Sequence, residues 1–292
     1  MNGQVAVQLI VNGLAVGAIY ALVALGLVLT YKATQVLNFA HGDLMTVGAF
    51  VAWWAVGVGG VSFWLALPLA LAFVAGLSYA IDALLVRRIV GQPQFSGVML
   101  TIALAFMLRG ATSMVFGAES RSLATPWTGQ TTTLGGAVVS DLNLVILAVV
   151  LAATALLLVF LRHTRLGVAM QAASQNQLAA FLNGIPVKRV NSLVWALAGL
   201  MAALAGVLLA PVTLVDINMW SVMLNALAAL VLGGFGSIAG AIVGGLLIGQ
   251  IEQWTGVFGP DGSKEVVAHV LLITMLILRP HGLLGEAHGR RV

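Results

Sequence analysis

The sequence contains no cysteine and few charged residues. The absence of cysteine excludes disulfides and Cys-ligated zinc or iron–sulfur centres. Charged residues make up 8% of the chain and hydrophobic residues 61%, whereas an ordinary soluble domain has about 25% and roughly 45–50%. A water-soluble fold is therefore excluded. The five histidines do not cluster at metal-ligand spacing, so no metal site is expected.

Motifs for catalysis and nucleotide binding are also absent. The three lysines, Lys32, Lys188 and Lys264, do not lie in a G-x-x-x-x-G-K-[ST] sequence, so the chain cannot bind ATP through a P-loop. There is no H-E-x-x-H or G-x-S-x-G motif and no close pair of carboxylates in a polar setting. We therefore expect no catalytic residue, no cofactor in this chain and no enzymatic activity. Any energy from ATP must come through another subunit.

Long apolar runs dominate the sequence. A membrane-spanning helix needs about 20 apolar residues, so 292 residues accommodate about eight to ten crossings. We expect an all-α, polytopic membrane protein with one transmembrane domain over residues 1–292. Glycines interrupt the second run and the two runs around Gly233, where broken or re-entrant segments would fit. The nine runs are Val5 to Thr30, Phe39 to Val58, Phe63 to Val86, Ser96 to Val115, Leu142 to Leu161, Ser192 to Pro211, Val222 to Leu232, Ala239 to Trp254 and Val266 to Leu278.

The positions of the basic residues indicate the orientation in the membrane. If the loop that carries Arg87 and Arg88 is cytoplasmic, alternating crossings place ten Lys and Arg residues inside and two, Arg121 and Lys264, outside. Because short cytoplasmic loops are enriched in Lys and Arg, the N-terminus is predicted outside and the C-terminus inside. Five tryptophans lie near the predicted outer ends of the spans. This placement agrees with the orientation, because tryptophan rings prefer the membrane–water interface. The ten inner residues are Lys32, Arg87, Arg88, Arg162, Arg165, Lys188, Arg189, Arg279, Arg290 and Arg291.

Two loops are long enough to have functions of their own. The outer loop, residues 116–141, is rich in Ser, Thr and Gly. It either presents hydrogen-bonding groups to a partner or a substrate, or is a polar tether. The inner loop, residues 162–190, alternates apolar and polar residues at roughly helical spacing, which predicts one or two short amphipathic helices. Such helices lie on lipid headgroups or fit a groove on a cytoplasmic partner, and the many alanines favour the partner.

Polar residues inside the apolar runs are candidates for function because they are costly in a membrane. Arg109 and Glu252 either reach an interface or pair internally, and Asn12 and Asn225 suit hydrogen bonds between helices. The stretch from Asn38 to Asp43 indicates either a capped or broken helix start near the pathway or a simple helix N-cap. The full set is Asn12, Asn38, His41, Asp43, Arg109, Asn225 and Glu252.

Glycines form a second pattern. Gly236, Gly240 and Gly244 recur at four-residue spacing directly after Gly233 and Gly234. Small residues at this spacing let helix backbones approach closely, so helix packing is one interpretation. The other compares this stretch with the glycine-bearing segment 41–48, because paired interrupted segments often flank a transport pathway.

Three segments together resemble a known family. Residues 38–50, 164–185 and 231–241 are similar, in order and spacing, to the LivH-type membrane permeases of branched-chain amino acid ABC importers. The resemblance implies a bacterial inner-membrane importer of leucine, isoleucine and valine. It further implies a LivM-type second permease, two cytoplasmic ATP-binding subunits that hold ATP and Mg, a periplasmic substrate-binding protein, and no nucleic-acid partner.

The resemblance also assigns candidate residues. The inner loop would be the segment that couples the permease to the ATPases, through Gly167, Ala172, Ala173, Ala179, Gly184 and Ile185. Pathway or structural candidates are Asn38, His41, Gly42, Asp43, Gly233, Gly236 and Gly240.

Two residues depart from the family pattern, and two other functions stay open. Asp43 stands where Glu is common in the family and keeps the negative charge. Gln171 stands where Arg is common in the coupling loop, so a positive charge is lost there. Relatives of this type also serve importers of urea, short amides and aromatic acids. An ATP-independent secondary transporter is the alternative from another class.

Overall fold

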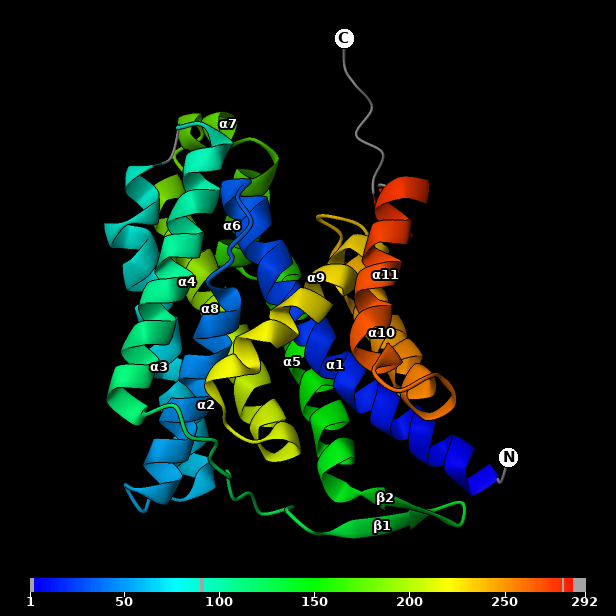
Figure 1. Ribbon diagram of the computed structural model, residues 1–292. Coiled ribbons are helices and arrows are strands. Elements are labelled where there is room, and N and C mark those ends of the chain that lie inside the picture. The colour runs from blue at the N-terminus through cyan, green and yellow to red at the C-terminus, as the bar shows by residue number, and fades with distance from the viewer. Residues whose placement is uncertain (1–2, 90–91, 280, 286–292) are drawn as a thin grey trace. The chain divides into compact units, whose positions relative to one another are not determined.

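The structure, a computed structural model, describes residues 3–89, 92–279 and 281–285. Within these residues the chain is mainly helical, which confirms the predicted all-α fold (Figure 1). Each of the nine predicted apolar runs coincides with a helix, and the inner loop forms two more. The helices are α1 (Gly3–Thr34), α2 (His41–Gly57), α3 (Phe63–Leu84), α4 (Gln94–Phe116), α5 (Asp141–His163), α6 (Arg165–Gln175), α7 (Gln177–Leu182), α8 (Val187–Thr213), α9 (Val222–Gly233), α10 (Ile238–Phe258) and α11 (Ser263–Leu278), with the 3₁₀ helices η1 (Val86–Arg88) and η2 (Ile217–Ser221).

Five segments of the described chain are long and apolar enough to cross a membrane. They are α1, α3 together with η1, α4, α5 and α8. The remaining apolar helices are shorter or interrupted by polar residues: α2 has 17 residues, α9 has 12, and α10 carries Gln250 and Glu252. The protein is therefore polytopic, while the count of eight to ten crossings stays a prediction.

Two compact units make up the described chain. The α2–α8 unit comprises Leu29–Pro126 and Ala152–Ser221. The α9–α11 unit comprises the described residues of Met1–Val28, Trp127–Leu151 and Val222–Val292. The expectation of a single domain over residues 1–292 stays a prediction.

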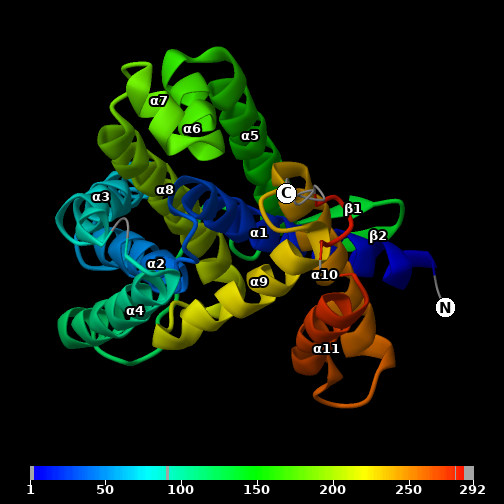
Figure 2. The same cartoon turned by 90° about the horizontal axis from the view of Figure 1, so that it is seen from above.

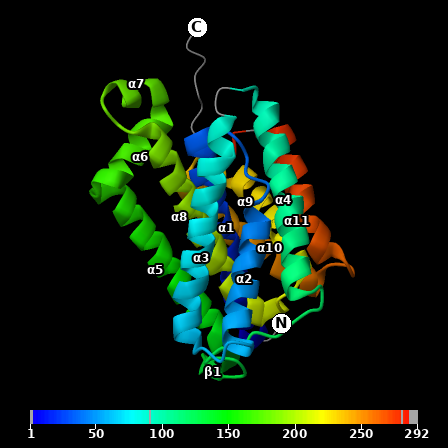
Figure 3. The same cartoon turned by 90° about the vertical axis from the view of Figure 1, so that its left-hand side faces the viewer.

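Helices α2, α3 and α8 form the core of the α2–α8 unit and run side by side (Figure 3). Glycines permit this close packing. A Cβ atom at Gly206 would meet the backbone of Met45 on α2, and one at Gly199 would meet Ser78 on α3. Trp195, on the same helix, is among the largest fully buried side chains. Small residues on α8 thus bring two helices against it at once.

In the α9–α11 unit, glycines of α10 contact two different neighbours. Helices α9, α10 and α11 pack together (Figure 2). Gly240 and Gly244 approach the backbone of α9, whereas Gly245 and Gly249 approach α1. Gly240 and Gly244 therefore serve helix packing, as one of the two interpretations predicted, whereas Gly236 precedes α10 with φ of 82°.

The outer loop contains a β-hairpin that the sequence analysis did not predict. Strands β1 (Thr131–Leu134) and β2 (Ala137–Ser140) pair antiparallel, with Leu134 opposite Ala137. The two connecting residues, Gly135 and Gly136, have φ of 58° and 83°. A two-residue hairpin turn with both φ values positive favours glycine, since a side chain is strained there. The outer loop is thus partly ordered by its own backbone hydrogen bonds.

Candidate functional site: the broken helix start and the inner helical segment

Helix α2 begins beside the middle of a neighbouring helix. After α1 ends, the chain runs along α4: Gln94 donates to the carbonyl oxygen of Gln35 at 2.9 Å, and Thr101 to that of Leu37 at 3.1 Å. The two α4 residues are seven positions apart, which corresponds to about 10 Å of helix. The start of α2 therefore lies within the length of α4 rather than at its end. The start of α2 is therefore organised by contacts with α4, and its place near a pathway stays a prediction.

Asn38 organises the turn before α2. Its side-chain oxygen accepts a hydrogen bond from the N–H of Ala40 at 3.1 Å, and its carbonyl oxygen accepts one from the N–H of His41 at 3.2 Å. Asn38, His41 and Asp43 are almost completely buried. Buried backbone groups at a helix start need such partners, so Asn38 has a structural role at this position.

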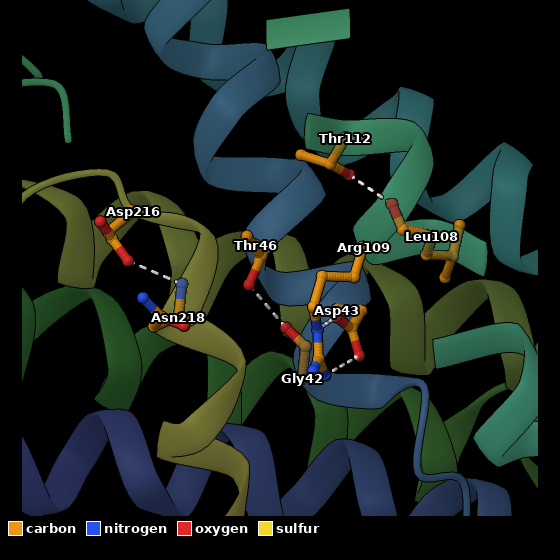
Figure 4. Close-up of polar contacts among 8 residues, drawn as sticks. All are labelled: Gly42, Asp43, Thr46, Leu108, Arg109, Thr112, Asp216 and Asn218. Atoms are coloured by element: carbon orange, nitrogen blue, oxygen red, sulfur yellow. Dashed lines mark hydrogen bonds and ion pairs between the residues drawn. The ribbon is translucent and has the colours of Figure 1, made fainter. Parts of the chain in front are cut away.

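An ion pair joins the start of α2 to α4 (Figure 4). Arg109 donates from Nε to one carboxylate oxygen of Asp43 at 2.9 Å and from Nη2 to the other at 3.2 Å. The guanidinium group also lies 3.9 Å from the ring centroid of Trp220, on η2. Arg109 thus pairs internally, which is one of the two alternatives given by the sequence, and three elements meet at one charge pair.

Neighbouring hydroxyl groups bond within their own helices. Thr46 donates to the carbonyl oxygen of Gly42 at 3.0 Å, and Thr112 to that of Leu108 at 2.7 Å (Figure 4). These bonds satisfy the hydroxyl hydrogens inside the bundle. Neither of these bonds links α2 to α4.

The segment after α8 is tied to the outer loop of the same unit. Arg121 and Val215 exchange two backbone hydrogen bonds, and Ser120 donates to Asp216 at 2.7 Å. The hydrogen bonds from Ser120 and from the N–H of Asn218 hold the pKa of Asp216 below its usual range. Since the folded pKa is lowered, the stabilising effect is present at neutral pH and is lost only in acid, as pH falls through that value.

A second polar cluster lies in the α9–α11 unit. Tyr20 donates to a carboxylate oxygen of Glu252 at 2.7 Å, and Asn225 donates to the hydroxyl oxygen of Tyr20 at 3.2 Å. Asn143 donates to Asn12 at 2.6 Å. Both Asn12 and Asn225 therefore link helices, as the sequence predicted, and Glu252 pairs internally.

Helices α6 and α7 form the inner helical segment, residues 164–186. Thr164 and Asn176 cap their N-termini by accepting hydrogen bonds from Gly167 and Ala179. Gly184, with φ of 83°, and Pro186 then separate α7 from α8. The sequence predicted one or two short helices here, and the structure has two.

The small residues of this segment lie on both of its faces. Gly167 approaches the backbone of Phe160 and Leu161, and Ala173 is buried within the unit. Ala179 and Gly184 are exposed, and Ala172 and Ile185 are partly exposed. Their assignment to coupling stays a prediction, because burial of the first two is explained by internal packing.

Bulky apolar side chains cover the exposed face of the same segment. The many alanines of this segment favoured a protein partner over lipid. The structure instead leaves large side chains of both helices exposed: Leu166, Val168, Leu178, Phe181 and Leu182. A group of exposed apolar residues bordered by polar ones is typical of a surface that contacts a protein or a membrane.

Gln171 has an internal role. Its side-chain amide donates to the carbonyl oxygen of Leu161 on α5 at 2.9 Å, which holds α6 against the end of that helix. The residue that departs from the family pattern therefore contributes to the position of α6.

The long apolar helices define a polytopic membrane protein. A family model described as branched-chain amino acid transport system / permease component matches residues 9–278. The chain belongs to this family, so it is a transport permease and not a catalytic enzyme.

Individual relatives agree with the family. The high-affinity branched-chain amino acid transport system permease protein LivH of Salmonella typhimurium is 29% identical, over 98% of this chain and 97% of that protein. The corresponding permease protein BraD of Pseudomonas aeruginosa is 32% identical over the same shares. The solved structure of PsaBC from Streptococcus pneumoniae in complex with Fab matches 92% of this chain and 91% of its own, with a TM-score of 0.50 and 16% identity. That last likeness concerns the fold alone.

Proposed function

We propose that this chain is the permease subunit of an ABC importer for branched-chain amino acids in a bacterial inner membrane. The observation that carries the proposal is the similarity to LivH and BraD over 98% of the chain. The partners would be a LivM-type second permease, two cytoplasmic ATPases that bind ATP and Mg, and a periplasmic binding protein. The inner helical segment would dock on an ATPase through its exposed apolar face.

Alternating access is the mechanism that suits these parts. ATP binding and hydrolysis in the partners would displace the inner helical segment, and rigid helices would rock to open the pathway to one side at a time. The closely packed α2 and α8 can move as one body because their backbones meet at Gly48 and Gly206. Asn38, His41, Gly42 and Asp43 would border the pathway at the broken helix start, and Gly233, Gly236 and Gly240 at the interrupted segment of the other half.

The orientation is proposed from the basic residues. Because most Lys and Arg residues fall in the predicted inner loops, the N-terminus would lie outside and the C-terminus in the cytoplasm. Arg290 and Arg291, which contribute to that bias, lie outside the described residues.

Labelling of single cysteines tests the orientation. The chain has no cysteine of its own, so introduced thiols report without background. Thr133→Cys lies on the exposed strand β1, and Gln175→Cys lies at the exposed end of α6. We expect a membrane-impermeant maleimide to label the first in intact spheroplasts and the second only after permeabilisation. The reverse pattern would invert the proposed topology.

The cargo is tested by ATP hydrolysis in the assembled complex. Hydrolysis should rise most with a binding protein loaded with leucine, isoleucine or valine. The alternative cargoes, urea, short amides and aromatic acids, are tested with their own binding proteins at matched saturation. A larger response to urea or benzoate would assign the chain to another branch of the same permease type.

A further inference from the structure

A buried polar network joins α3 to the start of α8. Ser192 donates to a carboxylate oxygen of Asp82 at 2.6 Å. Arg87, on η1, donates from Nη2 to the hydroxyl oxygen of Ser192 at 2.5 Å and to the carbonyl oxygen of Lys188 at 3.2 Å. Asp82 is 1% exposed and Ser192 is fully buried. The hydroxyl group of Ser192 thus bridges Asp82 and Arg87, which lie 110 and 105 residues earlier in the chain.

Stability alone does not account for this network. A buried group of charged and polar side chains is often no more stabilising than apolar side chains of similar volume. The network is also incompletely satisfied, since Nε of Arg87 is buried and has no hydrogen-bond partner among the described residues. An unused buried donor is costly. We therefore infer that the network fixes the start of α8 relative to α3 and η1 rather than giving maximal stability.

The network lies where the inner helical segment rejoins the membrane helices. Helix α8 begins at Val187, directly after Pro186, and both α6 and α7 contact α8. Lys188 and Ser192 belong to the first two turns of α8, so Arg87 and Asp82 bind the part of α8 that a moving inner segment would displace first. Farther along the two helices, Gly199 packs directly on Ser78 of α3.

We propose that Asp82, Arg87 and Ser192 form a positioning clamp that makes α3 move together with α8 when the inner helical segment is displaced. The clamp rests on the proposed function, because it needs an ATPase to displace that segment. Its residues are positioning residues, since they touch neither the substrate nor the nucleotide. Without the clamp, displacement of α8 would no longer carry α3 with it, and ATP would be hydrolysed without full opening of the pathway.

The test measures transported substrate per ATP hydrolysed in proteoliposomes that contain the whole complex and its loaded binding protein. Ser192→Ala removes the bridging hydroxyl, and Asp82→Asn keeps the shape while removing the charge. Ser78→Ala is the matched control: its hydroxyl group is fully buried on the same helix face, one turn before Asp82, but has no hydrogen-bond partner among the described residues. We expect the two clamp variants to assemble and hydrolyse ATP normally while the ratio falls about tenfold, the scale of a lost hydrogen bond to a charged group. Ser78→Ala should keep the wild-type ratio.

A ratio that stays at the wild-type value in both clamp variants would overturn the clamp. A fall in transport and hydrolysis together, in the same proportion, would also overturn it, since that is the result of a purely structural role. A wild-type complex without a hydrolysis response to loaded binding protein would instead refute the proposed function, and the clamp with it.

A distance measurement tests the same proposal without transport. Spin labels at Leu85→Cys, beside the clamp, and Gln175→Cys, on the inner segment, are both at exposed positions. In the wild-type complex their separation should change by less than about 2 Å between the nucleotide-free and ATP-bound states, because the two parts move together. With Ser192→Ala added, the separation should change by more than that. Equal behaviour with and without the substitution would contradict the clamp.

Discussion

Arg109→Leu is expected to abolish accumulation of the folded permease. The substitution leaves Asp43, which is 2% exposed, as an unpaired charge inside a membrane bundle. Removing one partner of a buried ion pair costs about 3–5 kcal/mol, and this is a large part of the about 5–15 kcal/mol by which proteins are stable. Loss of the stack on Trp220 adds to the effect. The amount of detergent-solubilised, monodisperse protein measures the outcome.

The matched control for this prediction is the double variant Asp43→Leu with Arg109→Leu. It removes both charges, so no unpaired group is left, and it should restore accumulation to near the wild-type level. A single variant that accumulates and melts like the wild type would show that the pair does not stabilise the start of α2. A double variant as poor as the single one would show that the charges themselves, rather than their pairing, are needed.

Leu178→Glu combined with Phe181→Glu is expected to abolish ATPase capture. Both side chains are more than half exposed on α7, so the substitution does not disturb the core of the unit. A few bulky residues usually dominate an interface, and burying an unpaired charge there costs several kcal/mol. Uptake should therefore fall below about a tenth of the wild-type rate, and the ATPase subunits should be lost from the purified complex.

Val138→Glu is the matched control for the coupling variant. Val138 is another exposed apolar residue, on the outer hairpin, and should tolerate the charge with full ATPase content. If the α7 double variant retained its ATPase subunits and normal transport, the exposed face of the inner helical segment would not be the docking surface. The coupling role proposed for Gly167, Ala172, Ala173, Ala179, Gly184 and Ile185 would then have to be withdrawn.

Periodicity and composition were sufficient to predict the helices. Apolar runs set the position of each long helix, and the alternating pattern of residues 162–190 set α6 and α7. The internal pairing of Arg109 was one of two predicted alternatives, because a charge inside a span needs a partner. Its partner, Asp43, is 66 residues away. Such a distant pairing depends on tertiary packing, which local patterns do not encode.

Three features of the structure were missed for identifiable reasons. The hairpin strands have four residues each, too few for a clear alternation, although Gly135–Gly136 was a turn signal. In a helix of six residues such as α7, the pattern cannot indicate which apolar side chains point outward. Asp82 was not singled out, although an acid inside an apolar run is itself a signal of function.

Purification of the tagged wild-type chain from its native membrane, followed by reconstitution, is the most direct test of the proposed function. We expect the chain to co-purify with a second permease and ATP-binding subunits. Leucine uptake into proteoliposomes should then require ATP on the side of those subunits and loaded binding protein on the other side. A chain that purifies without any ATPase and transports alone under an ion gradient would contradict the account and support a secondary transporter.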